Sequence, residues 1–194
     1  MRATLDAVPS SRSARRTLIA DAALDVLAHT GARGLTHHAV DGRAGLAKGS
    51  TSYYCRTRVD LLALTLDRIV ELDLADVAAC RQRVEAGDDV ALVLGELVEH
   101  WLKEPARTRT AARLELFLLA SREDDLLEKL TSEREAFVAL GQTINDAADR
   151  PVSPELLGAI LMLVDGMLLT HIRLRLPAPA AADVRTTLRE MLAA

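Results

Sequence analysis

A short stretch near residue 50 gathers side chains of the kinds that contact nucleic acid. Within about two helical turns it places one cation, several hydroxyls and two aromatic rings: Lys48, Ser50, Thr51, Ser52, Tyr53 and Tyr54. Such groups donate hydrogen bonds to phosphates and reach the edges of bases in the major groove. A helix of this composition would be a poor core element, because Ser, Thr and Gly have low helix propensity. The chemistry that the stretch predicts is recognition of DNA.

The elements around this stretch predict a helix-turn-helix over residues 35–62. Thr36 is placed to cap a short first helix and Gly45 to end it, because glycine adopts the left-handed conformation without strain. Leu46 would fill the small core inside the turn, and residues 47–54 would form the second helix, which enters the major groove. The alternative is an ordinary surface helical turn, since helix-turn-helix patterns produce false positives.

This segment resembles the DNA-binding domain of the tetracycline repressor (TetR) family of bacterial transcription regulators. The residues that carry the likeness are 19–31 (the first helix and its terminating glycine), Leu35-Thr36, 44–50 (the turn and the start of the second helix), and Tyr53-Tyr54 followed by Arg58 and Leu61-Leu62. They span about the first third of the chain, and the remainder matches only in length and helical character. The resemblance implies an all-α fold of about nine helices. In it, a three-helix DNA-binding domain with its N-terminal arm (residues 1–58) precedes a helical ligand-binding and dimerisation domain (residues 59–194).

The resemblance also implies which residues meet DNA. They are Thr36, His37, His38, Lys48, Gly49, Ser50, Thr51, Ser52, Tyr53, Tyr54 and Arg58. Three positions depart from the family pattern: Asp41 stands where Ala is usual, Ser52 where Tyr is common, and Cys55 where Phe is common. Asp41 needs water or a partner, because an unpaired buried charge is costly. The departure at Ser52 puts individual base contacts in doubt.

Charge is distributed unevenly along the 194 residues, whose formal net charge is -4. The first 58 residues hold nine Lys or Arg and four Asp or Glu, whereas the rest hold 15 and 24. A basic head on an acidic body is expected when only the head meets DNA, although chance also produces basic N-termini. Hydrophobic residues make up 49% of the chain and aromatic residues 3%, a mix that favours helices packed through Leu, Ala and Val.

Other signals in the sequence exclude some classes of protein. The longest apolar run, residues 156–169, contains Asp165 and is shorter than a membrane span. The N-terminus lacks the apolar segment of a signal peptide, and Cys55 and Cys80 have neither metal-site spacing nor the pattern of a disulfide framework. We therefore expect a cytoplasmic protein with no metal, no cofactor and no membrane partner.

The N-terminal arm, residues 1 to about 11, is followed by three arginines. Arg12, Arg15 and Arg16 either contact phosphate or the minor groove, or form a solvated basic start of the first helix.

Helical periodicity and helix breakers predict a first helix at about 13–29 and six helices after the head, at about 58–85, 89–103, 106–120, 123–149, 153–175 and 181–192. The 106–120 helix would turn Leu114, Phe117 and Leu118 inward. The 153–175 helix is apolar on nearly all sides, so we expect it to be buried around its circumference. In the resembled family the last two helices form a four-helix bundle across a two-fold axis, which implies a homodimer. The alternative is the central helix of a monomer.

A small-molecule pocket in the body is likewise implied by the resemblance, and its occupation would move the 58–85 helix and change the spacing of the two heads. The candidate lining residues are the large or polar ones on inward faces: His100, Trp101, Arg113, Phe117, Phe137, Met162 and Asp165, and beyond these Met167 and His171. For each the alternative is ordinary packing. Asp165 has two more alternatives, pairing with an arginine or setting register at the dimer axis.

These observations support one leading hypothesis, a ligand-responsive transcription regulator, in the first place a repressor. It would bind a palindromic DNA operator as a homodimer and be released by an unknown small-molecule effector. The second hypothesis is a helical ligand-binding or protein-interaction module without selective DNA binding, which the departures at Asp41, Ser52 and Cys55 would favour. An enzyme is disfavoured, because no Ser/His/Asp, Cys/His or two-carboxylate arrangement stands out.

Overall fold

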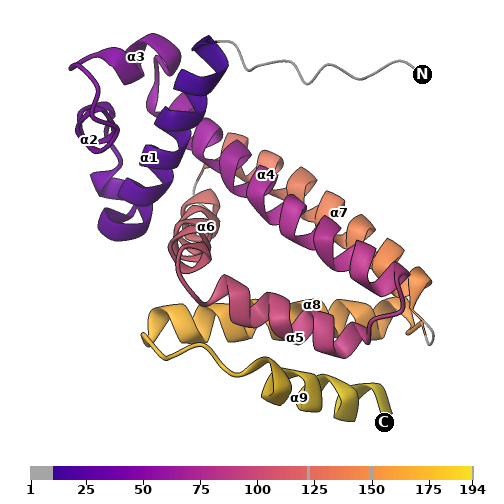
Figure 1. Cartoon of the computed structure of the whole chain (residues 1–194). Helices are drawn as coiled ribbons and strands as arrows, with labels where there is room; N and C mark the ends of the chain where they lie inside the picture. Colours follow the sequence, from indigo (N-terminus) through magenta and orange to yellow (C-terminus); the bar gives the residue numbers. More distant parts are fainter. Residues whose placement is uncertain (1–10, 122, 149–150, 194) are drawn as a thin grey trace, which may run out of the picture.

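The computed structural model describes residues 11–121, 123–148 and 151–193, and in this part of the chain it contains helices and connecting turns but no strand (Figure 1). The helices are α1 (Ser11–Gly34), α2 (His37–Arg43), α3 (Ser50–Tyr54), α4 (Arg58–Glu85), α5 (Val90–Trp101), α6 (Ala106–Ala120), α7 (Asp124–Ala147), α8 (Pro154–Arg173) and α9 (Ala181–Ala193). The predicted all-α fold is confirmed. The predicted N-terminal arm lies, except for its last residue, outside the described residues.

A small head is formed by α1, α2, α3 and the first turns of α4 (Figure 1). Thr36 caps α2 by accepting a 3.1 Å hydrogen bond from the Ala39 N–H, and Gly45 follows the end of α2 with a φ of 64°. Gly31 interrupts α1 with a φ of 67°. The head is held together by fully buried aliphatic side chains, among them Ile19, Leu27, Leu35, Val40 and Leu61. The helices predicted for residues 35–62 are therefore present.

The second helix of the pair begins later than predicted. Gly49 has a φ of 92°, a left-handed conformation that cannot belong to a regular α-helical turn, so α3 starts only at Ser50 and not at residue 47. Ala47 and Ser50 form a turn in which the Ser50 hydroxyl donates to the Ala47 carbonyl at 2.6 Å. Lys48 consequently lies in the turn before α3 and not on the helix.

The long α4 connects the head to the body. A capping box starts it: the Asp60 N–H donates to Thr57 Oγ1 at 3.0 Å, and the Thr57 N–H donates to the Asp60 carboxylate at 2.9 Å. The helix then runs alongside α7 (Figure 1). The buried apolar residues of α4 up to Val70 belong to the hydrophobic cluster of the head. Those from Val77 onward belong to a second cluster in the body. One continuous helix thus contributes to both cores.

The inward face of α6 differs from the predicted one. Leu116 is fully buried in the head cluster, together with Ala112 and Ala120, and Arg113 is also buried. Phe117 is partly exposed, and Leu118 is 63% exposed. The helix is rotated relative to our expectation because α6 packs on α1 and turns two arginines toward α4, where carboxylates pair with them. The cluster that holds the head therefore includes part of α6, and a domain boundary after residue 58 remains a prediction.

In the single chain α8 is buried on one face only. Ile160, Val164 and Leu168 are buried, whereas Met162 is 63% exposed and Leu169 is also exposed. The prediction of burial around the whole circumference is wrong for one copy of the chain. Over its 20 residues, α8 is also long and apolar enough to cross a membrane by length and composition alone. It nonetheless packs through its buried face against α5, α6 and α7.

The last helix, α9, lies against α5 (Figure 1). Gly95 permits this approach, because a Cβ there would lie 2.5 Å from the Ala181 carbonyl oxygen. Asp89 accepts from the Ala91 N–H at the start of α5 and pairs with Arg185 and Arg189 of α9 at 2.9 and 2.6 Å. The pKa of Asp89 is lowered, because these bonds outweigh the opposing effect of its burial.

Candidate DNA interface and ligand cavities

The outer face of α3 presents the side chains that suit base and phosphate contacts. Tyr53 is 73% exposed, and Ser52 is exposed beside it. Tyr54 is half-buried and packs edge to face against Tyr53, with ring centroids 5.1 Å apart. Lys48 and Gly49 are exposed in the turn that precedes the helix. Exposed donor side chains are thus present on α3 and in the turn before it.

A buried carboxylate sets the position of α3. Asp41, at 2% exposure, accepts hydrogen bonds from the Gly49 N–H, the Thr51 N–H and the Thr51 hydroxyl, each 2.7 Å long. Burial raises the pKa of Asp41, but these bonds and the nearby His38 outweigh it, so the pKa lies below its usual value. The partner that the sequence required for Asp41 is therefore the start of α3 itself.

This arrangement corrects one predicted DNA contact. Thr51 is completely buried, and its hydroxyl is directed to Asp41, so its side chain cannot reach a base or a phosphate. Ser50 is half-buried, and its hydroxyl donates within the turn. Of the predicted contact residues at α3, Ser52 and Tyr53 on the helix and Lys48 and Gly49 in the preceding turn remain exposed.

Three further predicted contact residues have structural partners. His37 Nε2 lies 2.7 Å from the Cys55 carbonyl oxygen and so ties the start of α2 to the end of α3. Arg58 donates to the carbonyls of Leu35 and Ala32 at 2.7 and 2.5 Å, holding α4 to the loop before α2 and to the end of α1. Thr36 is exposed, and its hydroxyl caps α2. Of the two histidines, only His38 is exposed.

Two adjacent cavities, each of about 110 Å³, lie in the body between α4 and α8. The first, here called the apolar cavity, is lined almost entirely by aliphatic and aromatic side chains of α4, α5, α7, α8 and α9. The second, here called the ion-pair cavity, adds charged residues: Asp73, Arg113, Arg134 and Asp165. The two cavities share Trp101, Phe137, Leu161 and Val164 as lining residues.

The predicted pocket residues divide between cavity lining and other positions. Those that line the ion-pair cavity are Trp101, Arg113, Phe117, Phe137 and Asp165. Met162 lies on the exposed face of α8 and lines neither cavity, which corrects the prediction. His100 also lines neither, because its half-exposed side chain lies 3.5 Å from Asp76. Met167 is absent from both linings as well, and His171 Nδ1 lies 2.7 Å from the Pro177 carbonyl.

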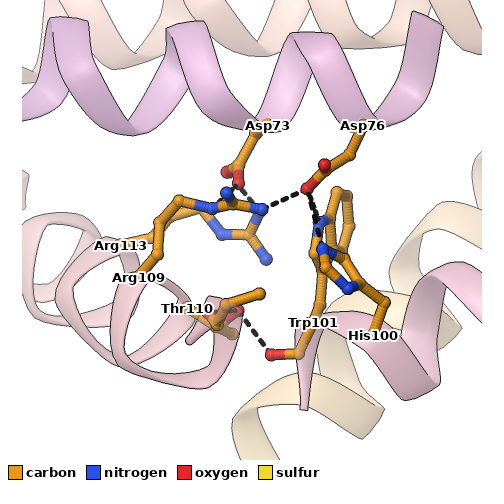
Figure 2. A network of polar contacts seen from close by, with 8 residues as sticks. Asp73, Asp76, His100, Trp101, Arg109, Thr110 and Arg113 are labelled. Carbon is orange, nitrogen blue, oxygen red and sulfur yellow. Dashed lines mark hydrogen bonds and ion pairs between the residues drawn. The ribbon is translucent and has the colours of Figure 1, made fainter. Parts of the chain in front are cut away.

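Beside the cavities, five residues form a closed polar ring that links α4, α5 and α6. Asp73 Oδ1 lies 2.6 Å from Arg109 Nε, and Asp73 Oδ2 accepts from Arg113 Nη1 at 2.7 Å. Asp76 pairs with Arg109 and accepts from Trp101 Nε1 at 2.9 Å. Arg113 completes the ring with its Cζ 4.7 Å from the centre of the indole. Figure 2 shows both carboxylates projecting from α4 toward the guanidiniums.

Sequence reasoning missed three members of this ring. Asp73 and Asp76 are spaced three residues apart on α4, and Arg109 lies four residues before Arg113 on α6. Residues at these spacings share one helix face. The signal available in the sequence was therefore an acidic pair and a basic pair in two otherwise apolar helices. Buried charges of this kind require each other, because an unpaired one is costly.

Comparisons with known proteins agree with this architecture. The family model described as "Tetracyclin repressor-like, C-terminal domain" matches residues 85–194. A TetR family member from Streptomyces coelicolor A3 is 26% identical, with a TM-score of 0.75, over 91% of this chain and 97% of that one. The multidrug binding protein EbrR complexed with ethidium is 28% identical, with a TM-score of 0.68, over 91% and 97% of the two chains. No curated protein matches the sequence.

A transcriptional regulator from Rhodococcus sp. Rha1 is 21% identical, with a TM-score of 0.75, over 91% of this chain and 94% of that one, and it shares the fold. The family model covers more than half of the residues, and the helix-turn-helix head precedes the part that it matches. The chain belongs to the TetR family of transcription regulators.

Proposed function

We propose that the protein is a ligand-responsive repressor of the cytoplasm that binds a near-palindromic operator as a homodimer and leaves it when a small molecule occupies the body. The observation that carries this proposal is the exposed donor face of Lys48, Ser52 and Tyr53, set at the tip of the head by the buried Asp41 cap. A docked helix with such a face reads the major groove, while its flanking cations and hydroxyls contact phosphate.

The alternative of a module that no longer reads DNA loses its main support. Asp41 departs from the family pattern but is fully paired, and it orders the start of α3 instead of disrupting it. Cys55 is buried in the head cluster and fills a core position as a small apolar side chain. Of the three departures, only Ser52 lies on the proposed DNA face.

A second copy of the chain is the partner that best fits the exposed apolar face of α8. Met162 and Leu169 lie on this face. Gly166 lies between these two residues in the sequence and is exposed, so a second chain can approach the helix closely there. Large apolar side chains exposed on one helix face are costly in water and favour an interface. Two-fold pairing through it would place two heads on one duplex, where half-sites are spaced about 34–36 Å apart.

The geometry of α4 supports coupling between the cavities and the head. Arg58 at its start is held by carbonyls of the head, and Asp73 belongs to the polar ring beside the cavities. Fifteen residues of helix separate them, which corresponds to about 22 Å. A ligand that moves α4 at Asp73 would therefore displace the head, and two displaced heads no longer match fixed half-sites.

The ligand that suits the two cavities is an aromatic molecule. Trp101 and Phe137 line both of them, and the apolar walls would bury the body of such a ligand. EbrR, a multidrug binding protein, forms complexes with ethidium and with proflavin, which are flat aromatic compounds. This likeness supports an aromatic effector without identifying it.

A gel shift on the DNA that flanks the protein's own coding region tests the regulator proposal, because such regulators often act on their own promoters. We expect a discrete band that survives excess nonspecific DNA, weakens steeply with salt and disappears with Tyr53→Ala. Lys103→Ala, which removes an exposed cation of the body, should leave the band unchanged. A band that Tyr53→Ala and Lys103→Ala affect equally would contradict the assignment of the DNA face.

A further inference from the structure

Arg113 is the buried arginine of the ion-pair cavity, and some of its hydrogen-bond donors are unused. The residue is 8% exposed and lines the cavity. One nitrogen, Nη1, donates to Asp73, and the guanidinium lies over the Trp101 ring. Its Nε is buried and has no hydrogen-bond acceptor among the described residues. A buried donor without an acceptor is costly, so a ligand oxygen that reached this nitrogen would be stabilised there.

The Arg113 guanidinium has one edge, formed by Nε and Nη2, that Asp73 does not use. Only Nη1 of Arg113 is engaged by a described residue, so neither nitrogen of that edge has a described acceptor. Two parallel N–H groups on one edge match the two oxygens of a carboxylate. Stacking on Trp101 and the bond to Asp73 fix the plane of the guanidinium before any ligand arrives.

The carboxylates near this cavity are already engaged. Asp73 gives one oxygen to Arg109 and the other to Arg113. Asp76 is shared by Arg109 and Trp101. Asp165 pairs with Arg134 at 3.2 Å, and both side chains are about half exposed. A cationic ligand would have to compete with a guanidinium for each of these acids, whereas an anion finds the second edge of Arg113 open.

The neighbouring apolar cavity offers no comparable polar group. Its polar side chain is Asn145, whose amide is satisfied by both the carbonyl and the N–H of Val152, at 3.0 and 2.8 Å. Trp101 and Phe137 line both cavities and connect the polar region to the apolar one. A ligand that fills the two spaces is therefore apolar along its length and polar at one end.

We propose that the effector is an elongated aromatic molecule with a single carboxylate, which the Nε–Nη2 edge of Arg113 binds. This inference rests on the proposed use of the cavities as the effector site. It differs in charge from ethidium and proflavin, which are aromatic cations. The ligand carboxylate and Asp73 of α4 would then bind one guanidinium through different edges, Asp73 through Nη1. The binding group and the helix that carries the head would thus meet at Arg113.

Isothermal titration calorimetry on the full-length protein tests the proposal with three probes of one shape and different charge: 4-biphenylcarboxylate, 4-biphenylcarboxamide and 4-biphenylcarboxamidine. We expect the carboxylate to bind about tenfold or more tightly than the amide, because a charge-assisted bidentate pair is stronger than a neutral one. Arg113→Met should bring the two affinities together. Asp73 keeps its contact with Arg109 in this variant, so the fold should survive.

Two further variants distinguish a bidentate bond to Arg113 from attraction to any positive charge in the cavity. Arg113→Lys keeps the charge without the two-nitrogen edge and should restore only part of the preference. Arg134→Met, which removes the other guanidinium of the cavity, should leave the preference intact. If Arg113→Met does not fold, the ratio of carboxylate to amide affinity is compared between the wild type and Arg134→Met, and a ratio of about tenfold or more that persists in Arg134→Met supports Arg113.

Several results would overturn the proposal: equal affinity for the carboxylate and the amide, tightest binding of the amidine, a preference that depends on Arg134 instead of Arg113, or no binding of the carboxylate. None of these readouts involves DNA. Carboxylate binding without operator binding would contradict the regulator proposal but support the carboxylate ligand. Operator binding without carboxylate binding would support the regulator proposal and overturn the carboxylate ligand.

Discussion

The Asp41 carboxylate and the Thr51 hydroxyl are joined by a 2.7 Å hydrogen bond in the interior of the head, ten residues apart in the sequence. The same carboxylate accepts from the backbone N–H groups of Gly49 and Thr51. Asp41 thus serves the start of α3 as an N-cap residue normally would, but from the preceding helix. Gly49, at the N-cap position, has no side chain with which to do so.

Replacing Asp41 with Ala should lower the free energy of unfolding by about 1–3 kcal/mol, because it leaves the buried N–H and hydroxyl of Thr51 without an acceptor. Asp41→Asn keeps one acceptor oxygen and should lose less. Urea denaturation followed by circular dichroism measures both changes. Asp183→Ala, at an exposed position of α9, is the matched control and should stay within about 0.5 kcal/mol of wild type. An equal loss of unfolding free energy in Asp41→Ala and Asp183→Ala would contradict the claim that Asp41 caps α3.

The Asp41 cap should also give stability a pH dependence of known sign. Its pKa is lowered in the folded protein from an ordinary value of 3.8, so its contribution is complete above 3.8 and is lost as the pH falls through the lowered pKa. The stability difference between wild type and Asp41→Asn should therefore be constant from pH 7 to about 5 and shrink in acid. Urea midpoints measured from pH 7 to 3 check this. A difference that persists or grows in acid would show that the ionised carboxylate is not the stabilising form.

Lys48 should contribute to DNA affinity through phosphate. Removing one phosphate contact lowers the slope of log affinity against log salt by about one, with little change in sequence preference. Lys48→Ala should show this decrease in fluorescence anisotropy titrations on operator DNA over a series of KCl concentrations. Lys103→Ala, on α5's C-terminal side, provides the control and should keep the wild-type slope. Identical slopes for all three proteins would remove Lys48 from the interface.

The exposed face of α8 should hold two copies together. Met162→Glu places a charge on this face and should convert dimers to monomers, because a carboxylate buried against apolar side chains is strongly unfavourable. Size-exclusion chromatography with light scattering measures the mass. Val59→Glu changes a similarly apolar, exposed position on α4 and should leave the mass unchanged. A Met162→Glu protein that remains dimeric would place the interface elsewhere.

Sequence signals located the helices best where a cap or a breaker marks their ends. The bounds of α4, 58–85, and of α6, 106–120, agree with the prediction, since Thr57 and Asp60 define one start and Pro105 precedes the other. The predicted start of α3, residue 47, was three residues too early, because the sequence does not show that Gly49 adopts a positive φ instead of a helical one. Local chemistry therefore explains both the agreement and the error.

Which face of a helix is buried depended on partners far away in the chain. Phe117 and Leu118 have the apolar character of core residues, yet Arg113 takes the inward position on α6 because Asp73 of α4 is there to pair with it. The candidate site shows the same limit. The sequence named Trp101 and Arg113, but only the fold brings them together, since Asp76 and Arg109 connect them through contacts between three helices.

Selection of duplexes from a random DNA pool by the full-length protein tests the central claim most directly, because it requires no knowledge of the operator. We predict enrichment of a two-fold symmetric sequence whose half-sites lie about one helical turn apart or a multiple of it. Tyr53→Ala should abolish this enrichment, and Lys103→Ala should preserve it. Failure of a folded wild-type dimer to enrich any sequence would contradict the account and favour a module that binds a ligand without reading DNA.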